Sequence, residues 1–477
     1  MTRSEIIVSL NSLQSKINIE QYSFGGTNIW PMIKTKLFFI LFKKYSSQDN
    51  PAKSAVHARK FRSIQLLVLS AFYSLFLRLS IKKSEIIFSG YEFEEVKIKN
   101  ITKNKYYLLL EDICRKNDIS FVYFNNYFKG LSYHIRNNSI SIPLYLKVYR
   151  FIFKILKQFR LIKIKSEGII ERSLFLSELG LTNEELDIFL KELEMELLTL
   201  RVNIFAFKKI LKKLSPSKIF ELCYYNTTHY AINQVANSLG VITYDIQHGA
   251  TGALHVAYAN MNTTIEHKIL PKYFWCWDKD SYSTVENWAQ HQRFSEPLLL
   301  GNPWNIYLSS EGTLNQTNNT NKNTILLTLQ FDVIDEKLLD IIYRTQTKYE
   351  WLIRFHPSMN RTKNNVINQL KAKGIKLDLE YPNKEHLPIL LMQCYVHISR
   401  YSGSIIEANN LGKYSIIIDK IGKETFKSLI DDHEAFYIDD LNNLEEVIAL
   451  ISTKPILAQN VFDDLFKNIK VQILGHH

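Results

Sequence analysis

One segment of the chain, residues 396–418, constrains the fold more than any other. It predicts a short apolar strand over 396–399, a turn rich in Ser and Gly over 400–404, a helix over 405–411 and a second strand over 414–418. Strands that alternate with helices are typical of a parallel sheet. The segment therefore predicts an α/β domain built on parallel strands.

The turn in this segment also predicts a ligand site. The first backbone N–H groups of a helix have no partner inside the helix, and together with the helix dipole they favour an anion such as phosphate. Ser402 and Ser404, on either side of Gly403, add hydroxyl groups, and Glu407 follows about one turn later. A carboxylate there can accept both hydroxyls of a ribose, so the segment fits a nucleotide. The alternative is an ordinary strand–helix–strand unit with a Ser-rich cap.

Alternation of strands and helices recurs on both sides of a polar, low-complexity stretch over residues 309–323, which is typical of a linker. Strands are expected before it at 85–89, 120–124, 218–224, 241–246, 269–277 and 298–302, and after it at 324–329, 350–355, 375–379 and 396–399. A chain of 477 residues also exceeds what one core usually holds. We expect an N-terminal α/β domain with helical insertions over 1–310, a linker over 311–323 and a C-terminal nucleotide-binding α/β domain over 324–477, with a ligand cleft between them.

The N-terminal part carries a basic arm over residues 34–83, in which Asp49 is the single acid, and the whole chain has a net charge of +12. Such a charge suits a surface that meets anions or a membrane. Within the arm, residues 64–79 form an apolar helical run that is shorter than the roughly 20 residues of a membrane span. Two interpretations stay open: a buried core helix, or a basic helix that lies on the inner membrane surface.

The cysteines and the N-terminus indicate the compartment. The four cysteines are far apart and lack metal-ligand spacing, which favours free thiols in a reducing cytosol. The first residues have no apolar segment of the signal-peptide type, so export is not expected. We expect a cytoplasmic protein, free or peripheral on the inner face of the cytoplasmic membrane.

In the second half, a strand is expected to end at Arg354, His356 and Pro357. Pro357 stops the strand, and residues two apart on a strand face the same side, so Arg354 and His356 are expected together at the strand end. They could bind a diphosphate or phosphodiester and stabilise its charge as it leaves. The alternative is a structural His beside a Pro turn.

In the first half, Gln247, His248 and Gly249 follow an expected strand. Gly249 allows close backbone approach to a ligand, and a His is suited to proton transfer near neutral pH. Glu92 and Glu94 follow another strand end, and Asp112 lies further along. We predict His248 as the first candidate catalytic residue, with Glu92 and Asp112 as carboxylate candidates. The alternatives are a loop His with turn glycines and solvated loop carboxylates.

Several familiar motifs are absent from the sequence. It contains no GxxxxGK[ST], no GxGxxG after a strand, no HExxH and no GxSxG. No DxD-like pair stands at a strand end. We therefore expect no metal ion and no cofactor.

Four motifs, in this order, carry a resemblance: IQHGATG at 246–252, LGNPWN at 300–305, RFHP at 354–357 and SRYSGSIIEANNLGK at 399–413. They resemble bacterial capsule and lipopolysaccharide glycosyltransferases of GT-B architecture, in particular the transferases that use CMP-activated Kdo, sialic-type or pseudaminic-type sugars. The resemblance implies two Rossmann-type domains facing a cleft. It also implies that His356 with Pro357, and Ser402 with Ser404, bind the CMP moiety. The serines are adjacent in that family, whereas Gly403 separates them here, so an NDP-hexose donor stays an alternative.

The resemblance and the residues together predict a metal-independent glycosyltransferase of surface polysaccharide biosynthesis. It would move an acidic sugar from a CMP donor to a lipid-linked or oligosaccharide acceptor, with no nucleic acid involved. A second alternative is a non-catalytic subunit that binds nucleotide sugar or polysaccharide and acts as a scaffold at the membrane.

Overall fold

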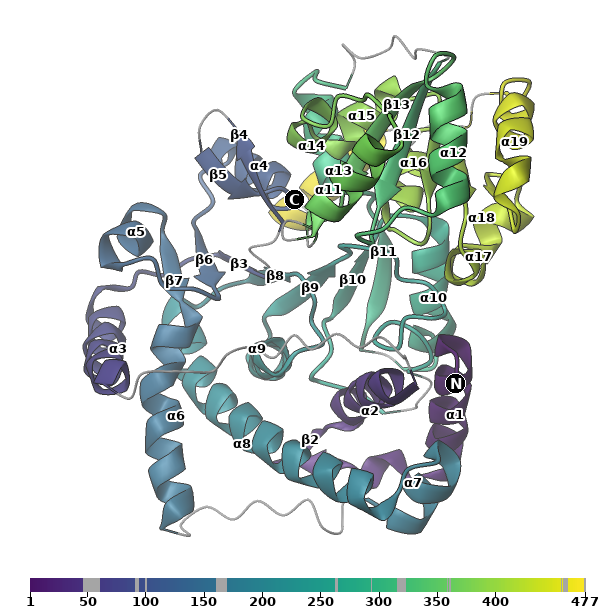
Figure 1. The fold of residues 1–477 in the computed structure, drawn as a ribbon. Coiled ribbons are helices and arrows are strands. Elements are labelled where there is room, and N and C mark those ends of the chain that lie inside the picture. Colours follow the sequence, from purple (N-terminus) through teal and green to yellow (C-terminus); the bar gives the residue numbers. More distant parts are fainter. Residues whose placement is uncertain are drawn as a thin grey trace.

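The structure is a computed structural model, and it describes residues 1–45, 61–90, 94–98, 101–159, 170–261, 265–292, 294–314, 323–357, 359, 362–455, 457 and 462–475. At residues 61–64, 101, 131, 132 and 136 it describes the backbone alone. Two α/β units lie one above the other, with a layer of helices beneath the lower unit (Figure 1).

The lower unit contains these elements in chain order: α1 Arg3–Lys16, β1 Ser23–Phe24, β2 Thr27–Asn28, α2 Trp30–Tyr45, α3 Phe61–Ser80, β3 Ile86–Ser89, β4 Glu95–Ile98, β5 Ile101–Asn104, α4 Leu108–Lys116, β6 Phe121–Asn125, α5 Leu131–Arg136, β7 Ser139–Ser141, α6 Ile142–Gln158, α7 Arg172–Leu179, α8 Asn183–Leu214, β8 Lys218–Glu221, α9 Thr227–Ser238, β9 Ile242–Ile246, β10 Tyr273–Cys276, α10 Lys279–Ala289, β11 Glu296–Leu299 and α11 Pro303–Ser310. The upper unit contains β12 Thr324–Leu329, α12 Glu336–Thr345, β13 Glu350–Phe355, α13 Lys363–Ala372, α14 Tyr381–Lys384, α15 Leu387–Gln393, β14 Val396–Ser399, α16 Ser404–Asn410, β15 Ser415–Ile417, α17 Lys420–Thr425, α18 Lys427–Asp431, β16 Ala435–Tyr437 and α19 Leu444–Ile451, and α20 Phe462–Leu474 ends the described chain.

We call the lower unit the first domain and the upper unit the second domain. The sheet of the first domain is seven-stranded and parallel, in the order β11-β10-β9-β8-β3-β6-β7. Its central strands are apolar runs that are buried along most of their length, as expected for a parallel sheet covered on both faces. The chain starts at β3, moves to β6 and β7 on one side, and then returns to β8 on the other. The order therefore reverses between β3 and β8, and ligands bind beyond the strand ends at such a point.

The sheet of the second domain is five-stranded and parallel, in the order β13-β12-β14-β15-β16. All six residues of β12 are buried, which makes it the centre of this core. Strand order reverses between β12 and β14. The Ser-rich segment predicted as a nucleotide site follows β14 directly, so it lies at this second reversal point.

The predicted fold class is confirmed. Two parallel-sheet α/β domains face each other in a GT-B-like arrangement, with extra helices on the N-terminal side. The strand expected at 375–379 is wrong, because these residues form no strand in the structure. Ile375 alone is deeply buried there, since its side chain packs in the core while the backbone turns toward α14.

The basic arm divides into two parts with opposite surroundings. Helix α2 lies inside the helical layer, and the ammonium of Lys34 donates to the Asn260 carbonyl at 2.6 Å. Helix α3 buries only one side and exposes large apolar residues on the other, so its interpretation as a buried core helix is wrong. No helix in the described part of the chain is both long and apolar enough to cross a membrane. Residues 46–60 of the arm lie outside the described residues.

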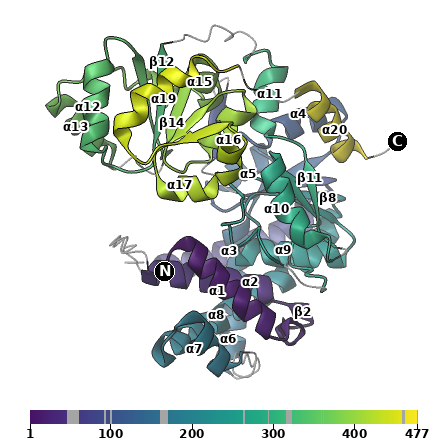
Figure 2. The same cartoon turned by 90° about the vertical axis from the view of Figure 1, so that its right-hand side faces the viewer.

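Helix α20 returns from the second domain to the first. It packs beside α4 and α11, where Figure 2 shows the three helices together. Lys218 of β8 donates to the Ile473 carbonyl at 2.6 Å, and the Tyr244 hydroxyl lies 3.2 Å from Gln472 Oε1. The domain limits 1–310 and 324–477 stay a prediction, and most of the expected linker, residues 315–322, lies outside the described residues.

Candidate functional site

Two loops from different domains touch between the two sheets. One loop follows β9 and holds residues 247–252, and the other follows β14 and holds residues 400–403. A Cβ added at Gly403 would lie 3.3 Å from the Gly249 Cα and 3.4 Å from the Ala250 nitrogen. A cavity of about 230 Å³ lies beside this contact, lined by residues of both domains. The structure thus brings together two motifs that the sequence placed in separate halves.

Gln247 fixes the loop of the first domain. Its side chain is buried, its Oε1 accepts from the Trp277 backbone N–H at 2.6 Å, and its Nε2 donates to the Gly249 carbonyl at 2.9 Å. Both ends of the amide are therefore used inside the protein. Gln247 positions the loop, and the side chain that the loop presents is His248.

His248 is half-buried beside the Tyr225 ring, with the ring centroids 6.3 Å apart and the rings stacked. Burial lowers the pKa of His248, the Glu94 carboxylate opposes this change, and the Lys105 ammonium adds to it. The imidazole is therefore neutral near pH 7. A neutral His with a carboxylate in its field can accept a proton, which is the property that a general base needs.

Glu94 and Lys105 form an ion pair at 2.8 Å where the β4–β5 hairpin begins and ends. The backbone N–H of Lys105 also donates to the Glu94 carbonyl at 2.9 Å, because the antiparallel register places the two residues opposite each other. The same two charges act on the pKa of His248 in the first domain and of His356 and Glu407 in the second. The ion pair therefore lies among side chains from both domains.

His356 and Glu407 form the second-domain side of this cluster. His356 is solvent-exposed, yet the surrounding protein partly desolvates it and lowers its pKa, with Glu94 opposing and Lys105 adding to the change. Burial raises the pKa of Glu407, while Lys105 lowers it, Glu94 raises it and Arg354 lowers it. Among the described residues, no hydrogen bond to the Glu407 carboxylate is found. The carboxylate therefore keeps its acceptor capacity for a ligand.

Arg354 has a different place from the one expected. Its Nη1 donates to the carbonyls of Pro382 at 2.8 Å and Glu385 at 2.6 Å, so the guanidinium holds the turn around α14. Burial lowers the pKa of Arg354, and the Glu407 carboxylate opposes this change. Arg354 is therefore a positioning residue with its charge near the cluster. Pro357 follows His356 on the exposed surface and ends β13.

The two serines of the predicted phosphate grip point in different directions. The Ser402 hydroxyl accepts from the Ser404 backbone N–H at 3.3 Å and remains half-buried at the turn. The Ser404 side chain is buried, and its hydroxyl lies 3.1 Å from Thr328 Oγ1 and 3.3 Å from His397 Nε2. Ser404 is thus part of the domain interior, and Gly403 packs against the loop of the first domain. Ser402 is therefore the half-buried hydroxyl that remains at the turn.

Two carboxylate candidates lie apart from this cluster. Asp112 is on α4, where burial raises its pKa and the charges that act on it come from Lys116 and Glu311, among others, rather than from Glu94. Glu92 lies outside the described residues. The carboxylate that the structure brings to the cluster is Glu94, which follows the same strand.

The sequence did not indicate Lys105, which belongs to the cluster, or Arg3, which lies near Tyr225 and Tyr401. Lys105 could have been found from the two short alternating runs at 95–98 and 101–104, which are typical of a hairpin. Arg3 on α1 gave no such signal. Burial lowers the pKa of Arg3, whereas Tyr225 of the first domain and Tyr401 of the second raise it. The charge of Arg3 therefore lies near both domains, whose facing surfaces we call the first and second walls of the site. Arg3 Nε is buried without a hydrogen-bond partner among the described residues.

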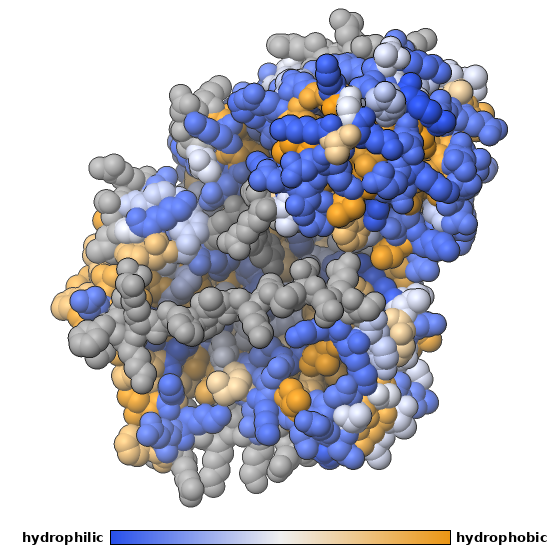
Figure 3. All heavy atoms as spheres, viewed as in Figure 1, coloured by the Kyte–Doolittle hydropathy of each residue, from blue (hydrophilic) through white to orange (hydrophobic). Residues whose placement is uncertain are grey.

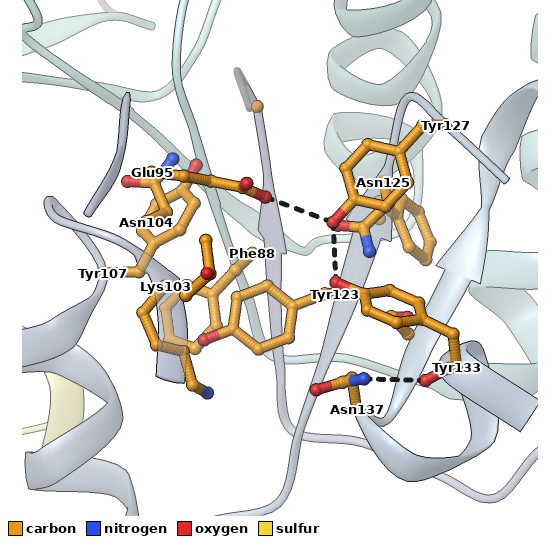
Figure 4. Close-up of a pocket in the computed structure, with 14 residues that line it drawn as sticks. Phe88, Glu95, Lys103, Asn104, Tyr107, Tyr123, Asn125, Tyr127, Tyr133 and Asn137 are labelled. Atoms are coloured by element: carbon orange, nitrogen blue, oxygen red, sulfur yellow. Dashed lines mark hydrogen bonds between the residues drawn. The ribbon is translucent and has the colours of Figure 1, made fainter. Parts of the chain in front are cut away.

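A separate pocket lies beyond the ends of β3, β6 and β7, and residues of β4 and β5 form part of its wall (Figure 4). Its walls are aromatic rings and amide or carboxylate side chains, namely Phe88, Glu95, Asn104, Tyr107, Tyr123, Asn125, Tyr127, Tyr133 and Asn137. The Tyr127 hydroxyl donates to Glu95 Oε1 at 3.2 Å and lies 2.9 Å from the Tyr133 hydroxyl. The pocket has a volume of about 50 Å³, and both aromatic rings and polar side chains line its walls. Of two neighbouring residues, Glu94 thus pairs with Lys105 in the cluster, and Glu95 lines the pocket.

No protein-family model matches the chain, and no curated protein sequence matches it. Among solved structures, it is similar to the UDP-GlcNAc 2-epimerase of Methanocaldococcus jannaschii in complex with UDP-GlcNAc and UDP, at 12% identity and a TM-score of 0.45, over 82% of this chain and 99% of that chain. It is also similar to the glycosyltransferase of kitacinnamycin (9% identity, TM-score 0.41, 82% and 95% covered) and to the wall teichoic acid polymerase TagF (12% identity, TM-score 0.37, 87% and 92% covered). The function is inferred from the site itself.

Proposed function

We propose that the protein is a glycosyltransferase that moves a sugar from a nucleotide donor on the second domain to an acceptor on the first. The observation that supports this most strongly is the contact between the two loops, where Gly403 of the second domain lies against Gly249, next to His248 of the first. The charges of the Glu94–Lys105 ion pair act on His248 and also on His356 and Glu407. The residues from each domain follow the ends of strands in a parallel sheet, and ligands bind at such strand ends in open α/β folds. A transferase needs these two sites to face each other.

The reaction needs a base on the acceptor side and a charge partner on the donor side. The acceptor oxygen attacks the anomeric carbon and forms the new C–O bond, while the bond to the donor phosphate oxygen breaks and the nucleotide leaves with the electron pair. His248, supported by Glu94, accepts the proton of the acceptor hydroxyl. His356 hydrogen-bonds the leaving phosphate as its charge grows.

The donor that we propose is a CMP-activated acidic sugar. His356, Pro357 and Ser402 match the motifs that resemble CMP-binding transferases, and Glu407 accepts the ribose hydroxyls. Arg3 supports an acidic sugar, because a guanidinium with a buried, unpaired N–H suits a carboxylate. The acceptor would be a lipid-linked or oligosaccharide glycan of a surface polysaccharide such as capsule, lipopolysaccharide or O-antigen, with its sugar in the pocket of Figure 4. The chemistry that we propose requires no metal ion.

Titration calorimetry with CMP, UDP and GDP tests the donor class. We expect CMP to bind most tightly. Tighter binding of UDP or GDP would replace the CMP donor by an NDP-hexose. Tight CMP-sugar binding without transfer to any glycan acceptor would instead favour a nucleotide-sugar-binding scaffold.

Arg3→Gln separates the sugar from the nucleotide. We expect this variant to weaken binding of a CMP-acidic sugar by about 1.5–3 kcal/mol, the range for a hydrogen bond to a charged group, and to leave binding of CMP unchanged. Equal losses for both ligands would show that Arg3 contacts the nucleotide or only supports the fold.

A further inference from the structure

Three helices of the first domain form a surface with charge of one sign. They are α3, α6 and the second half of α8, and α6 packs against both of the others (Figure 1). Every charged residue within residues 61–84, 142–159 and 197–214 is Lys or Arg. These segments are distant in the sequence, so the fold is what gathers their charge on one side of the molecule.

Helix α3 is fixed to this surface by its polar side. The Ser70 hydroxyl donates to the Leu144 carbonyl at 2.5 Å and accepts from the Val148 N–H at 2.9 Å. The Tyr73 hydroxyl accepts from the Ser141 N–H at 2.8 Å. These bonds fix which side of α3 faces α6, and so also which side faces outward.

The outward side of α3 is apolar. Six large side chains on it are exposed, with Leu79 at 77% and Phe72 at 67%, and the full set is Leu66, Val68, Phe72, Leu75, Phe76 and Leu79. Helix α6 continues this surface with exposed Phe151, Ile152, Ile155 and Phe159. We call these ten residues the apolar ridge. Figure 3 shows apolar surface along the left edge of the molecule, where Figure 1 places α3 and α6.

A basic groove adjoins the ridge. It has a volume of about 490 Å³, and its floor includes Tyr145, Tyr149 and Leu77. Arg78, Lys208, Lys209 and Lys212 are exposed at its rim. Among the described residues, none of these four cations forms an ion pair. Lys209 lies over the Phe205 ring at 4.3 Å, so its ammonium is held beside apolar surface.

We propose that this face docks on an anionic lipid bilayer, with the apolar ridge in the headgroup–acyl boundary and the basic groove on lipid phosphates. An amphipathic surface with Phe and Leu on one side and Lys and Arg beside them lies in the plane of a membrane interface. Anionic lipids attract the cations over about one Debye length. The positive charge of the groove favours an anionic bilayer as the partner. The ten exposed apolar residues of the ridge argue against a partner that binds through charge alone, such as nucleic acid.

This docking does not depend on the proposed reaction, although it would suit a lipid-linked acceptor. Helix α2, whose Lys34 is buried, takes no part in it. The proposed membrane surface therefore takes α3 from the basic arm, but not α2, and combines it with α6 and α8 from later in the chain.

Vesicle co-sedimentation tests the electrostatic part. The full-length protein is mixed with vesicles of phosphatidylcholine alone or of equimolar phosphatidylcholine and phosphatidylglycerol, at low and high salt. We expect binding to the anionic vesicles that falls as salt rises, and a loss of about tenfold or more for Lys208→Glu/Lys209→Glu/Lys212→Glu. The matched control is Lys363→Glu/Lys371→Glu/Lys376→Glu on the exposed surface of the second domain, which reverses the same number of charges and should bind as the wild type does. Equal binding by all three proteins, or none to anionic vesicles at low salt, would overturn the proposal.

A site-specific probe tests the ridge. All four natural cysteines are buried, so Leu79→Cys offers one accessible thiol for an environment-sensitive fluorophore. We expect its emission to shift to the blue with anionic vesicles, whereas Val333→Cys, which is 53% exposed on the second domain, should not shift. The label leaves the groove cations intact and replaces an exposed side chain, so folding is not at stake. No shift at position 79, or equal shifts at both positions, would show that the ridge does not enter the bilayer.

Discussion

The two walls of the candidate active site differ in how their polar groups are held. On the second-domain wall, Arg354 is bound to two backbone carbonyls and Ser404 to Thr328 and His397, so this wall is formed without a ligand. On the first-domain wall, the charged groups Glu94 and Lys105 pair with each other on a hairpin outside the main sheet. The polar groups of the second wall are thus held by bonds within their own domain, whereas the two charges of the first wall hold each other on the hairpin.

The largest effect is expected where the two walls touch. Gly403→Val would place a branched side chain against Gly249 and Ala250, where even a Cβ lies at 3.3–3.4 Å. The walls would shift apart, and a misplacement of about 1 Å can cost about 100-fold in turnover. Steady-state kinetics measure this loss. Gly252→Ala is the control at the same interface, because its Cβ would lie at an ordinary 3.5 Å from the Thr425 carbonyl oxygen.

The first wall is tested by Glu94→Gln. We expect kcat to fall by about tenfold to 100-fold, less than the roughly 10²–10⁴ for losing a general base itself, because Glu94 acts through His248, and we expect little change in donor affinity. Glu94 raises the pKa of His248, so its removal should also move the acidic limb of the pH–rate profile to lower pH. Glu95→Gln is the neighbouring control, which should raise the acceptor KM and leave that limb in place. An unchanged kcat in Glu94→Gln would remove this residue from the reaction.

For the second wall, His356→Ala should lower kcat more than it lowers donor affinity, because the imidazole meets the phosphate as its charge develops. A loss of about tenfold to 100-fold in kcat is expected, since the side chain is exposed and water can replace part of its contact. Single-turnover kinetics with calorimetry separate the two quantities. Equal losses would indicate ground-state binding instead.

Glu407→Ala should act on binding alone. The carboxylate is buried and is expected to accept two ribose hydroxyls, so its loss should weaken donor binding by about 1.5–3 kcal/mol. Calorimetry with the nucleotide measures this change. Glu446→Ala on the exposed side of α19 is the control and should bind as the wild type does. Unchanged binding by Glu407→Ala would mean that the ribose lies elsewhere.

The smallest effect concerns the pH dependence of folding stability that arises from two buried residues, Asp245 and His397. Burial raises the pKa of Asp245, under the first wall, to about 7, and lowers the pKa of His397, under the second, to about 3. Asp245 binds its proton more tightly in the folded protein than in the unfolded chain. Its contribution to folding stability is therefore present below the unfolded pKa of about 4 and is lost as pH rises toward 7. His397 has the opposite sign, because stability is lost as pH falls below its unfolded pKa of about 6.5.

Thermal unfolding of Asp245→Asn and His397→Gln across pH 5 to 8 should therefore diverge. Relative to the wild type, Asp245→Asn should gain up to about 1.4 kcal/mol per pH unit as pH rises toward 7. His397→Gln should gain relative to the wild type as pH falls below 6.5. Parallel curves for all three proteins would show that neither group carries its charge-state penalty in the folded protein.

The fold was predictable because its signal is local. Parallel strands such as residues 324–329 are apolar along their length, and helices such as 183–214 begin with a capping box, here Thr182 with Glu185. Residues 375–379 alternate between apolar and polar side chains, as a strand does, but no neighbouring strand in the described part of the structure pairs with them. The exposed side of α3 was ambiguous for a similar reason, since an apolar helix in the core and one at a membrane have the same composition.

The site was predictable only in part. His248, Gly403 and Glu407 follow strand ends, and the topology of parallel sheets brings such positions together. The direction of a single side chain depends on packing, and this is why Ser404 turned inward and Arg354 was taken up by carbonyls. Asp112 lies on a helix rather than at a strand end. Arg3 comes from the far end of the chain, and no local pattern could have placed it beside residue 401.

Because α20 packs on the first domain, the chain connects the two domains a second time. The first connection joins α11 to β12, and the second joins α19 to α20. Two bodies joined at one point can swivel in every direction, whereas two bodies joined at two separate points turn mainly about the line through both. We therefore expect fewer directions of relative motion between the two α/β units than a single connection would allow. Through its bonds to β8 and β9, α20 would restrict how the loop that carries Gly249 moves against Gly403.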